Sequence, residues 1–141
     1  ALIRSYLINY CAGFIYSTAP PPSVVGASIK SLELIRSMND QRVCLQKMSG
    51  WMREQLKGLG LQILRSESHI IPIVIGPESS TVKLSDHLQQ NGFLCQAIRP
   101  PTVEQGTSRL RITLNTKLTM EALQRFLEVL QFYVSSEHDT I

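Results

Sequence analysis

The amino-acid sequence predicts a small α/β domain of the α+β type. We expect a small mixed, mainly antiparallel sheet covered by helices and preceded by long N-terminal helices. In the first 58 residues, apolar side chains recur every three or four positions, which is typical of helices with one buried face. After Gly60, short runs rich in β-branched residues alternate with helical patterns. The 141 residues, 43% of them hydrophobic, suffice for one core.

The first helix is predicted over residues 2–14. Its apolar residues lie three or four positions apart and therefore share one face: Leu2, Ile3, Tyr6, Leu7, Tyr10, Cys11 and Phe14. The helix must end before residues 17–22, Ser-Thr-Ala-Pro-Pro-Pro, because prolines lack the N–H group that a helix uses and hold the preceding residue extended. We therefore expect an extended connection there.

Two more helices are predicted before Gly60, where the spacing of apolar residues changes from that of a helix to that of a strand. The first runs from a capping residue, Ser23, to about Met38. Its buried side is expected to carry Ile29, Leu32 and Ile35. The second is capped by Asn39-Asp40 and ended by Gly58 and Gly60. Its apolar positions are Val43, Leu45, Met48, Met52 and Leu56.

The second half is predicted to follow the order β-α-β-β-α after a short first strand. The predicted elements are strands over residues 61–64, 70–76, 93–98 and 109–114, and helices over residues 79–90 and 119–130. Pro72 cannot donate to a sheet ladder, so its strand is expected either at an edge or with a local break in its pairing. Gly92 is expected to end one helix and Thr119 to cap the other. The chain after Ser135 is expected to fray.

Composition excludes several functional classes. The net charge of +3 comes from lysines and arginines spread along the chain, which does not favour nucleic acid as a partner. The sequence contains no run of about 18 apolar residues, so no membrane-spanning helix is predicted. Cys11, Cys44 and Cys95 are odd in number and far apart, so neither a disulfide framework nor a metal site is predicted. A reducing compartment, the cytoplasm, fits best.

Arg109 and Arg111 are the main candidates for a binding site. They lie two apart on a predicted strand, so both guanidinium groups leave the same face, while Leu110 and Ile112 point into the core. A planar fork of N–H donors suits a carboxylate or phosphate. The alternative is a pair of solvated arginines on the open face of a sheet, and the spacing alone does not decide between them.

Other polar residues carry weaker signals. Ser17 and Thr18 precede a rigid proline run and can present hydroxyl groups to a phosphate, although the same residues are common in turns. No histidine has a nucleophile or carboxylate at an informative spacing: His69, His87 and His138. The lysines on predicted helices or turns are expected to be solvated, and none has the pattern of a Schiff-base lysine: Lys30, Lys47, Lys57, Lys83 and Lys117.

Two segments carry a resemblance to a known family. They are residues 14–22, Phe-Ile-Tyr-Ser-Thr-Ala-Pro-Pro-Pro, and residues 97–113, Ala-Ile-Arg-Pro-Pro-Thr-Val-Glu-Gln-Gly-Thr-Ser-Arg-Leu-Arg-Ile-Thr. Together they resemble the α-oxoamine synthase family, and the resemblance covers essentially the whole chain. Residues 98–103 are its most specific part and point to the branch of biotin biosynthesis. The alternatives are relatives such as 2-amino-3-ketobutyrate CoA ligase and 5-aminolevulinate synthase.

The resemblance implies a fold-type-I acyltransferase that uses pyridoxal 5′-phosphate. Such an enzyme condenses L-alanine with a pimeloyl thioester, carried by CoA or by a carrier protein, and releases CO2. The chain is implied to be the C-terminal part of a homodimeric enzyme. Residues 1–22 would link to the large cofactor domain, and residues 23–141 would form the C-terminal domain. Because the Schiff-base lysine is implied to lie in the large domain, we expect this part to be inactive alone and to hold no catalytic residue.

The resemblance also assigns roles to five residues. Arg111 matches the position that grips the α-carboxylate of the amino-acid substrate, and Arg109 is implied to be structural. Thr102 matches a substrate-contacting position in the loop before that strand. Thr18, and with it Ser17, matches a site near the cofactor phosphate or the acyl substrate across a dimer interface.

A different class of function stays open at this stage. A small sheet flanked by helices can also form a non-catalytic module that binds an amino-acid effector. The N-terminal apolar residues distinguish the two hypotheses. In a free-standing module they must be buried within this chain, whereas in the synthase they pack on the large domain or on a partner subunit: Leu2, Ile3, Tyr6 and Leu7.

Overall fold

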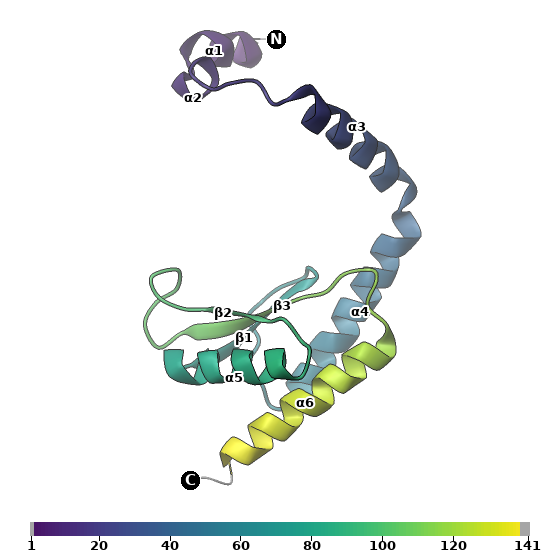
Figure 1. Cartoon of the computed structure of the whole chain (residues 1–141), viewed down its shortest axis with the longest axis vertical. Helices are drawn as coiled ribbons and strands as arrows, with labels where there is room; N and C mark the ends of the chain where they lie inside the picture. Colours follow the sequence, from purple (N-terminus) through teal and green to yellow (C-terminus); the bar gives the residue numbers. More distant parts are fainter. Residues whose placement is uncertain (1, 139–141) are drawn as a thin grey trace. The chain divides into compact units, whose positions relative to one another are not determined.

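The computed structural model describes the backbone of residues 2–138 and the side chains of residues 2–136 (Figure 1). Contacts divide the chain into an N-terminal unit that ends at Asn39 and a C-terminal unit that begins at Asp40. The boundary after residue 22 that the sequence predicts concerns a link to a domain outside this chain, and it stays a prediction.

The N-terminal unit begins with two short helices instead of the single helix predicted over residues 2–14. These are α1 (Leu2–Tyr10) and α2 (Ala12–Ile15). Cys11 separates them in an extended conformation, with φ −84° and ψ 104°. Asn9 and Gly13, which flank the break, are weak helix formers, so little opposes it.

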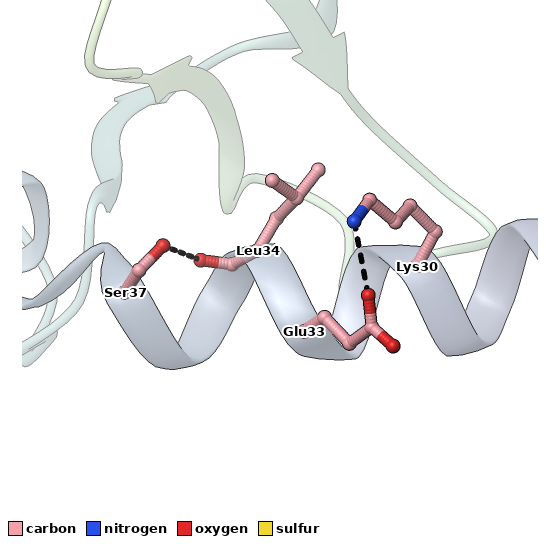
Figure 2. A network of polar contacts seen from close by, with 4 residues as sticks. All are labelled: Lys30, Glu33, Leu34 and Ser37. Atoms are coloured by element: carbon pink, nitrogen blue, oxygen red, sulfur yellow. Dashed lines mark hydrogen bonds and ion pairs between the residues drawn. The ribbon is translucent and has the colours of Figure 1, made fainter.

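The third helix of this unit is α3 (Pro22–Ser37). It starts one residue before the predicted cap, because Pro22 occupies the first helical position, where no N–H group is required. The expectation that Ser23 caps it is therefore wrong. Figure 2 shows two local contacts on α3: Lys30 Nζ lies 3.0 Å from Glu33 Oε2, and Ser37 Oγ donates to the carbonyl of Leu34 at 2.8 Å. An exposed ion pair of this kind contributes little to stability.

The predicted buried side of α3 is exposed. The exposed fractions of Ile29, Leu32 and Ile35 are 55%, 62% and 51%, and none of the described residues of α1, α2 and α3 is buried. The apolar period correctly indicates helices, but nothing in the described N-terminal unit covers their apolar side chains. The same holds for Leu2 and Ile3, which are 86% and 76% exposed.

Glycines end the first two helices of the C-terminal unit as the sequence predicts. The helix α4 (Asn39–Gly58) is followed by Gly60 at φ 74°, and the N–H of Leu61 donates back to the carbonyl of Leu56 at 3.2 Å. The helix α5 (Glu78–Gln90) is followed by Gly92 at φ 88° with the equivalent bond from Phe93 to Leu88. Both are Schellman motifs, in which a left-handed residue favours glycine.

Three antiparallel strands form the sheet: β1 (Ile70–Gly76), β2 (Gln96–Ile98) and β3 (Ser108–Thr113). Their order is β1-β3-β2, so Pro72 lies on an edge strand, as predicted. The strand predicted over residues 61–64 is reduced to a single bridge between Ile63 and Ile73. Pro72 has no N–H group, which limits the ladder on that side of β1. The strand β2 is also shorter than predicted.

One core cluster lies between the sheet and three helices of the C-terminal unit. Its buried residues come from α4, α5, α6 (Met120–His138), the sheet and its flanks: Met48, Met52, Leu56, Ile71, Ile73, Leu84, Leu88, Cys95, Leu110, Ile112, Leu114, Leu123, Phe126 and Leu130. The three helices therefore cover the same face of the sheet (Figure 1). The other face lacks this cover and carries the side chains of opposite parity in each strand.

Thr119 caps α6 as predicted. Its Oγ1 accepts a hydrogen bond from the N–H of Ala122 at 3.2 Å, which satisfies one of the free donors of the first turn. A hydrogen bond from the Thr119 side chain also lowers the pKa of Glu121. The helix continues past Ser135 to His138, so the expectation of fraying there is wrong for residues 136–138. Residues 139–141 lie outside the described part.

We predict that Leu56→Ala lowers the free energy of unfolding by about 2–5 kcal/mol, because it leaves a cavity in a fully buried site. Urea unfolding followed by circular dichroism measures this change. The matched control is Leu94→Ala, which alters a side chain that is 88% exposed and should change stability by about 0.5 kcal/mol or less. Equal losses in the two variants would contradict the core described above.

Candidate functional site

The structure places Arg109 and Arg111 on the same face of β3, the central strand of the sheet. Leu110 and Ile112, which alternate with them, are buried under the helices. Because β3 is paired on both sides, its backbone is fixed by two neighbouring strands. The two guanidinium groups therefore project from the central strand of the sheet toward the face that the helices leave open.

Arg109 is half-buried and bound to the turn that precedes β3. Its Nε donates to the carbonyl of Thr107 and its Nη2 to Thr107 Oγ1, both at 3.2 Å. Thr107 in turn donates through its hydroxyl group to the carbonyl of Glu104 at 2.8 Å. Gly106, between them, adopts φ 78°, a left-handed conformation that glycine accommodates without strain. Arg109 thus holds a turn in place, which is a structural role.

Arg111 is exposed, and unlike Arg109 it contacts a side chain on the neighbouring strand. Its Nη2 donates to Oε1 of Gln96, its direct partner across the β2–β3 pair. Within residues 2–136 no carboxylate lies within ion-pair distance of this guanidinium. Arg111 also lines an open hollow of about 480 Å³ beside β2. A guanidinium has five N–H donors, and the hydrogen bond to Gln96 occupies one of them.

Thr102 lies in the loop that joins β2 to β3. The Pro100–Pro101 bond before it is cis, and the N–H of Thr102 donates to the carbonyl of Arg99 at 3.0 Å. Its side chain is exposed. The C-terminal unit thus contains three of the predicted site residues, two of them on one sheet face and Thr102 in the adjoining loop.

Ser17 and Thr18 belong to the N-terminal unit, which is described by itself. Both side chains are exposed in the segment between α2 and α3. Ser17 Oγ lies 3.4 Å from the carbonyl oxygen of Phe14. Their hydroxyl groups are therefore exposed within this unit, and the role in ligand binding that the sequence predicts for them stays a prediction.

Sequence reasoning missed Gln96. The signal was weak: it is the one polar residue in the run Phe93 to Ile98. Alternation places it on the same side as Ile98, but only the register of β2 against β3 shows that it faces Arg111.

Cys95 borders the same hollow and is nearly fully buried. Burial raises the pKa of its thiol from 9.0 to about 11, because the surroundings disfavour the thiolate. The carbonyl of Cys95 accepts a hydrogen bond from Ser85 Oγ at 2.6 Å. A thiol that keeps its proton is a poor nucleophile and a poor metal ligand. We therefore assign Cys95 to the core.

The described residues hold no cluster of three or more metal-ligating side chains. The three cysteines are free thiols. His87 packs its ring against Tyr133 with 5.0 Å between ring centroids, and the side chain of His138 lies outside the described residues. A membrane crossing would need a longer and more apolar helix than any found in residues 2–138.

Comparison with known proteins places the chain in a family. The model of the aminotransferase class I and II family matches residues 2–130. The chain belongs to this family. Its small α/β architecture is the one that the sequence predicts for a part of a fold-type-I enzyme. A solved structure of a related enzyme shares this architecture.

Three relatives illustrate the similarity. The 8-amino-7-oxononanoate synthase of Stutzerimonas stutzeri is 41% identical over 124 residues, which is 88% of this chain and 32% of the relative. The crystal structure of the Francisella tularensis 8-amino-7-oxononanoate synthase superposes with a TM-score of 0.83 at 28% identity, over 97% of this chain and 40% of that one. A serine palmitoyltransferase of S. paucimobilis with bound PLP–myriocin shares the fold, with a TM-score of 0.85 at 21% identity over 94% and 34%. This chain thus spans about a third of the length of its curated relatives.

The two arginines are expected to differ in their effect on stability. Arg109→Ala removes two hydrogen bonds from a half-buried side chain and should lower the free energy of unfolding by about 1–2 kcal/mol. Arg111→Ala alters an exposed side chain and should change it by about 0.5 kcal/mol or less. Urea unfolding of the two variants measures the difference, and a reversed order would overturn the assignment of Arg109 as the structural arginine.

The Cys95 thiol predicts a pH dependence of stability. The unfolded thiol ionises near pH 9, whereas the folded one keeps its proton until about pH 11. Between these values the folded state binds more protons, so stability that is present below pH 9 is lost as the pH rises. The destabilisation caused by Cys95→Ala should therefore shrink by about 2 kcal/mol between about pH 8.5 and 10.5.

The control for this experiment is Leu94→Ala, which alters an exposed side chain that does not ionise. Its effect on the free energy of unfolding should be the same at both pH values. If Cys95→Ala also showed no pH dependence, the thiol would not be held protonated by the fold. Comparison of each variant with the parent chain at the same pH removes the contribution of the other ionisable groups.

Proposed function

We propose that the chain is the C-terminal part of an 8-amino-7-oxononanoate synthase. Such an enzyme condenses L-alanine with a pimeloyl thioester and releases CO2. The observation that carries the proposal is the exposed guanidinium of Arg111, which faces a hollow with no carboxylate of residues 2–136 paired to it. The identity to synthases of this name supports the choice within the family.

In this proposal Arg111 binds the α-carboxylate of L-alanine. A guanidinium and a carboxylate form two parallel charge-assisted hydrogen bonds, which fix the orientation of the amino acid as well as its position. Orientation matters here because the bond that breaks must be held in a defined direction for carbanion chemistry. Arg111 is suited to this task because its Cα lies on the central strand, paired with residues of both β1 and β2.

The cofactor implied by the family is pyridoxal 5′-phosphate, which supplies an electron sink for the amino-acid carbanion when it is bound. The accessible hydroxyl groups of Ser17 and Thr18 fit the cofactor phosphate as hydrogen-bond donors. The lysines considered above do not fit a Schiff base, because all are exposed on helices or turns, where an ordinary solvated ammonium is expected: Lys30, Lys47, Lys57, Lys83 and Lys117. We therefore place the Schiff-base lysine outside this chain and expect the chain to be inactive alone.

Exposed apolar side chains of the N-terminal unit fit the synthase. Nothing within that unit covers them, and they are 86%, 76%, 62% and 47% exposed: Leu2, Ile3, Tyr6 and Leu7. Uncovered apolar faces of this size mark contacts with other protein surfaces. We propose that the large domain, linked through residues 1–22, and the partner subunit of a homodimer cover them. The three free thiols fit a cytoplasmic location.

Thr102 is proposed to contact the substrate from the loop between β2 and β3. Its exposed hydroxyl group can donate or accept a hydrogen bond, and the turn fixes its backbone. The pimeloyl end is common to the CoA and carrier-protein thioesters, so either donor fits this arrangement. Other α-oxoamine synthases are the alternative, and they are distinguished by the amino acid and the thioester that the full-length enzyme accepts.

The proposal is tested in the full-length enzyme with Arg111→Ala. Loss of a charge-assisted contact should lower kcat/KM for L-alanine by about 10- to 100-fold, with the KM for the pimeloyl thioester and cofactor binding nearly unchanged. Steady-state kinetics with each substrate varied in turn measure this.

The control is Arg65→Ala, which alters an arginine that is 95% exposed and should leave both substrates unaffected. Unchanged alanine kinetics in Arg111→Ala would refute the role given to this residue. Condensation of glycine or serine in place of L-alanine by the parent enzyme would instead favour another member of the family.

A further inference from the structure

The partner of Arg111 is a neutral amide. Gln96 and Arg111 are direct cross-strand neighbours on the open face of the sheet, and Nη2 of the arginine donates to Oε1 of the glutamine. Side chains in such a pair stand side by side, so the contact needs no bend in either strand. Gln96 is itself exposed at the edge of the sheet and lines the same hollow as Arg111.

A neutral acceptor has a different effect from a carboxylate. An exposed arginine can occupy many rotamers, and immobilising it on binding costs conformational entropy. The Gln96 amide holds one N–H in advance, which reduces that cost. It leaves the positive charge uncompensated, whereas a carboxylate at the same place would neutralise the guanidinium and occupy the donors that a ligand needs.

Arg109 shows the contrast on the same strand. Its guanidinium is held by the carbonyl and the hydroxyl group of Thr107, through Nε and Nη2, so two sides of its fork are occupied. Arg111 is held at a single nitrogen. Arg109 is therefore bound to the turn through two of its nitrogens. Arg111 is oriented by one hydrogen bond, and its other N–H groups are not used for this contact.

We propose that Gln96 is a positioning residue that orients the Arg111 guanidinium for the carboxylate of the amino-acid substrate. The proposal rests on the function given to Arg111 above and adds a residue that acts through it. It predicts that the amide contributes to alanine binding and not to binding of the thioester. It also predicts that a negative charge at position 96 is worse than no acceptor at all.

Two variants of similar size test this in the full-length enzyme loaded with pyridoxal phosphate. Gln96→Met removes the acceptor and should raise both the Kd and the KM for L-alanine by about 3- to 10-fold, with the thioester KM unchanged. Gln96→Glu places a carboxylate on the guanidinium and should raise them by about 30-fold or more. Calorimetric titration with L-alanine gives the Kd without turnover.

Matched substitutions at an exposed glutamine of α5, Gln90→Met and Gln90→Glu, serve as controls and should leave alanine binding unchanged. Thermal unfolding of all variants checks that the fold persists. A role confined to packing would give Gln96→Met and Gln96→Glu similar effects on both substrates. Equal effects of this kind, or no effect on alanine binding, would overturn the proposal.

The double variant separates this proposal from the function on which it rests. In an Arg111→Ala background, Gln96→Met should have no further effect on alanine binding, because the amide then has nothing to orient. If Arg111→Ala impairs alanine use and the Gln96 variants do not, Gln96 is not a positioning residue and the role of Arg111 stands. If Arg111→Ala leaves alanine use intact, the proposed function itself fails.

Discussion

The alternation of side chains along β3 is the constraint on which the rest of the C-terminal unit depends. β3 is hydrogen-bonded to β1 on one side and to β2 on the other, so its residues cannot slip without moving the whole sheet. Leu110 and Ile112 are held under three helices, and this fixes Arg109 and Arg111 on the opposite face. The hydrophobic core therefore positions the guanidinium groups without touching them.

Local signals predicted several parts of the fold that local chemistry decides. Gly60 and Gly92 end helices because both adopt a left-handed conformation, and Thr119 caps α6 with its own hydroxyl group. The cap predicted at Ser23 fails for a local reason, because Pro22 takes the first helical position. Two other failures lie where distant contacts decide. The period of α3 identifies its apolar face, but a period does not state whether another surface covers that face. Likewise, residues 61–64 have strand composition, yet Pro72 on the neighbouring strand limits their pairing.

The sequence predicts one part of the candidate site and leaves another part open. The spacing of two residues on a strand predicts that Arg109 and Arg111 share a face, because the period of a strand is two. It does not predict which of them is free. That depends on the turn at Thr107 for one arginine and on Gln96 for the other. The register that pairs Gln96 with Arg111 joins two strands, and the spacing of residues within either strand does not predict it.

The exposed apolar side chains of the N-terminal unit and the exposed guanidinium of Arg111 differ in what they would gain from a partner. Burying a Leu or Ile side chain stabilises a protein by about 1.5–3 kcal/mol, and the apolar residues of α1 and α3 gain little of this within the N-terminal unit. An exposed cation costs little in water, so Arg111 needs no partner for stability. A covering protein surface would therefore stabilise the apolar faces, whereas Arg111 gains no comparable stability from a partner. This difference supports separate roles in assembly and in recognition of the amino acid.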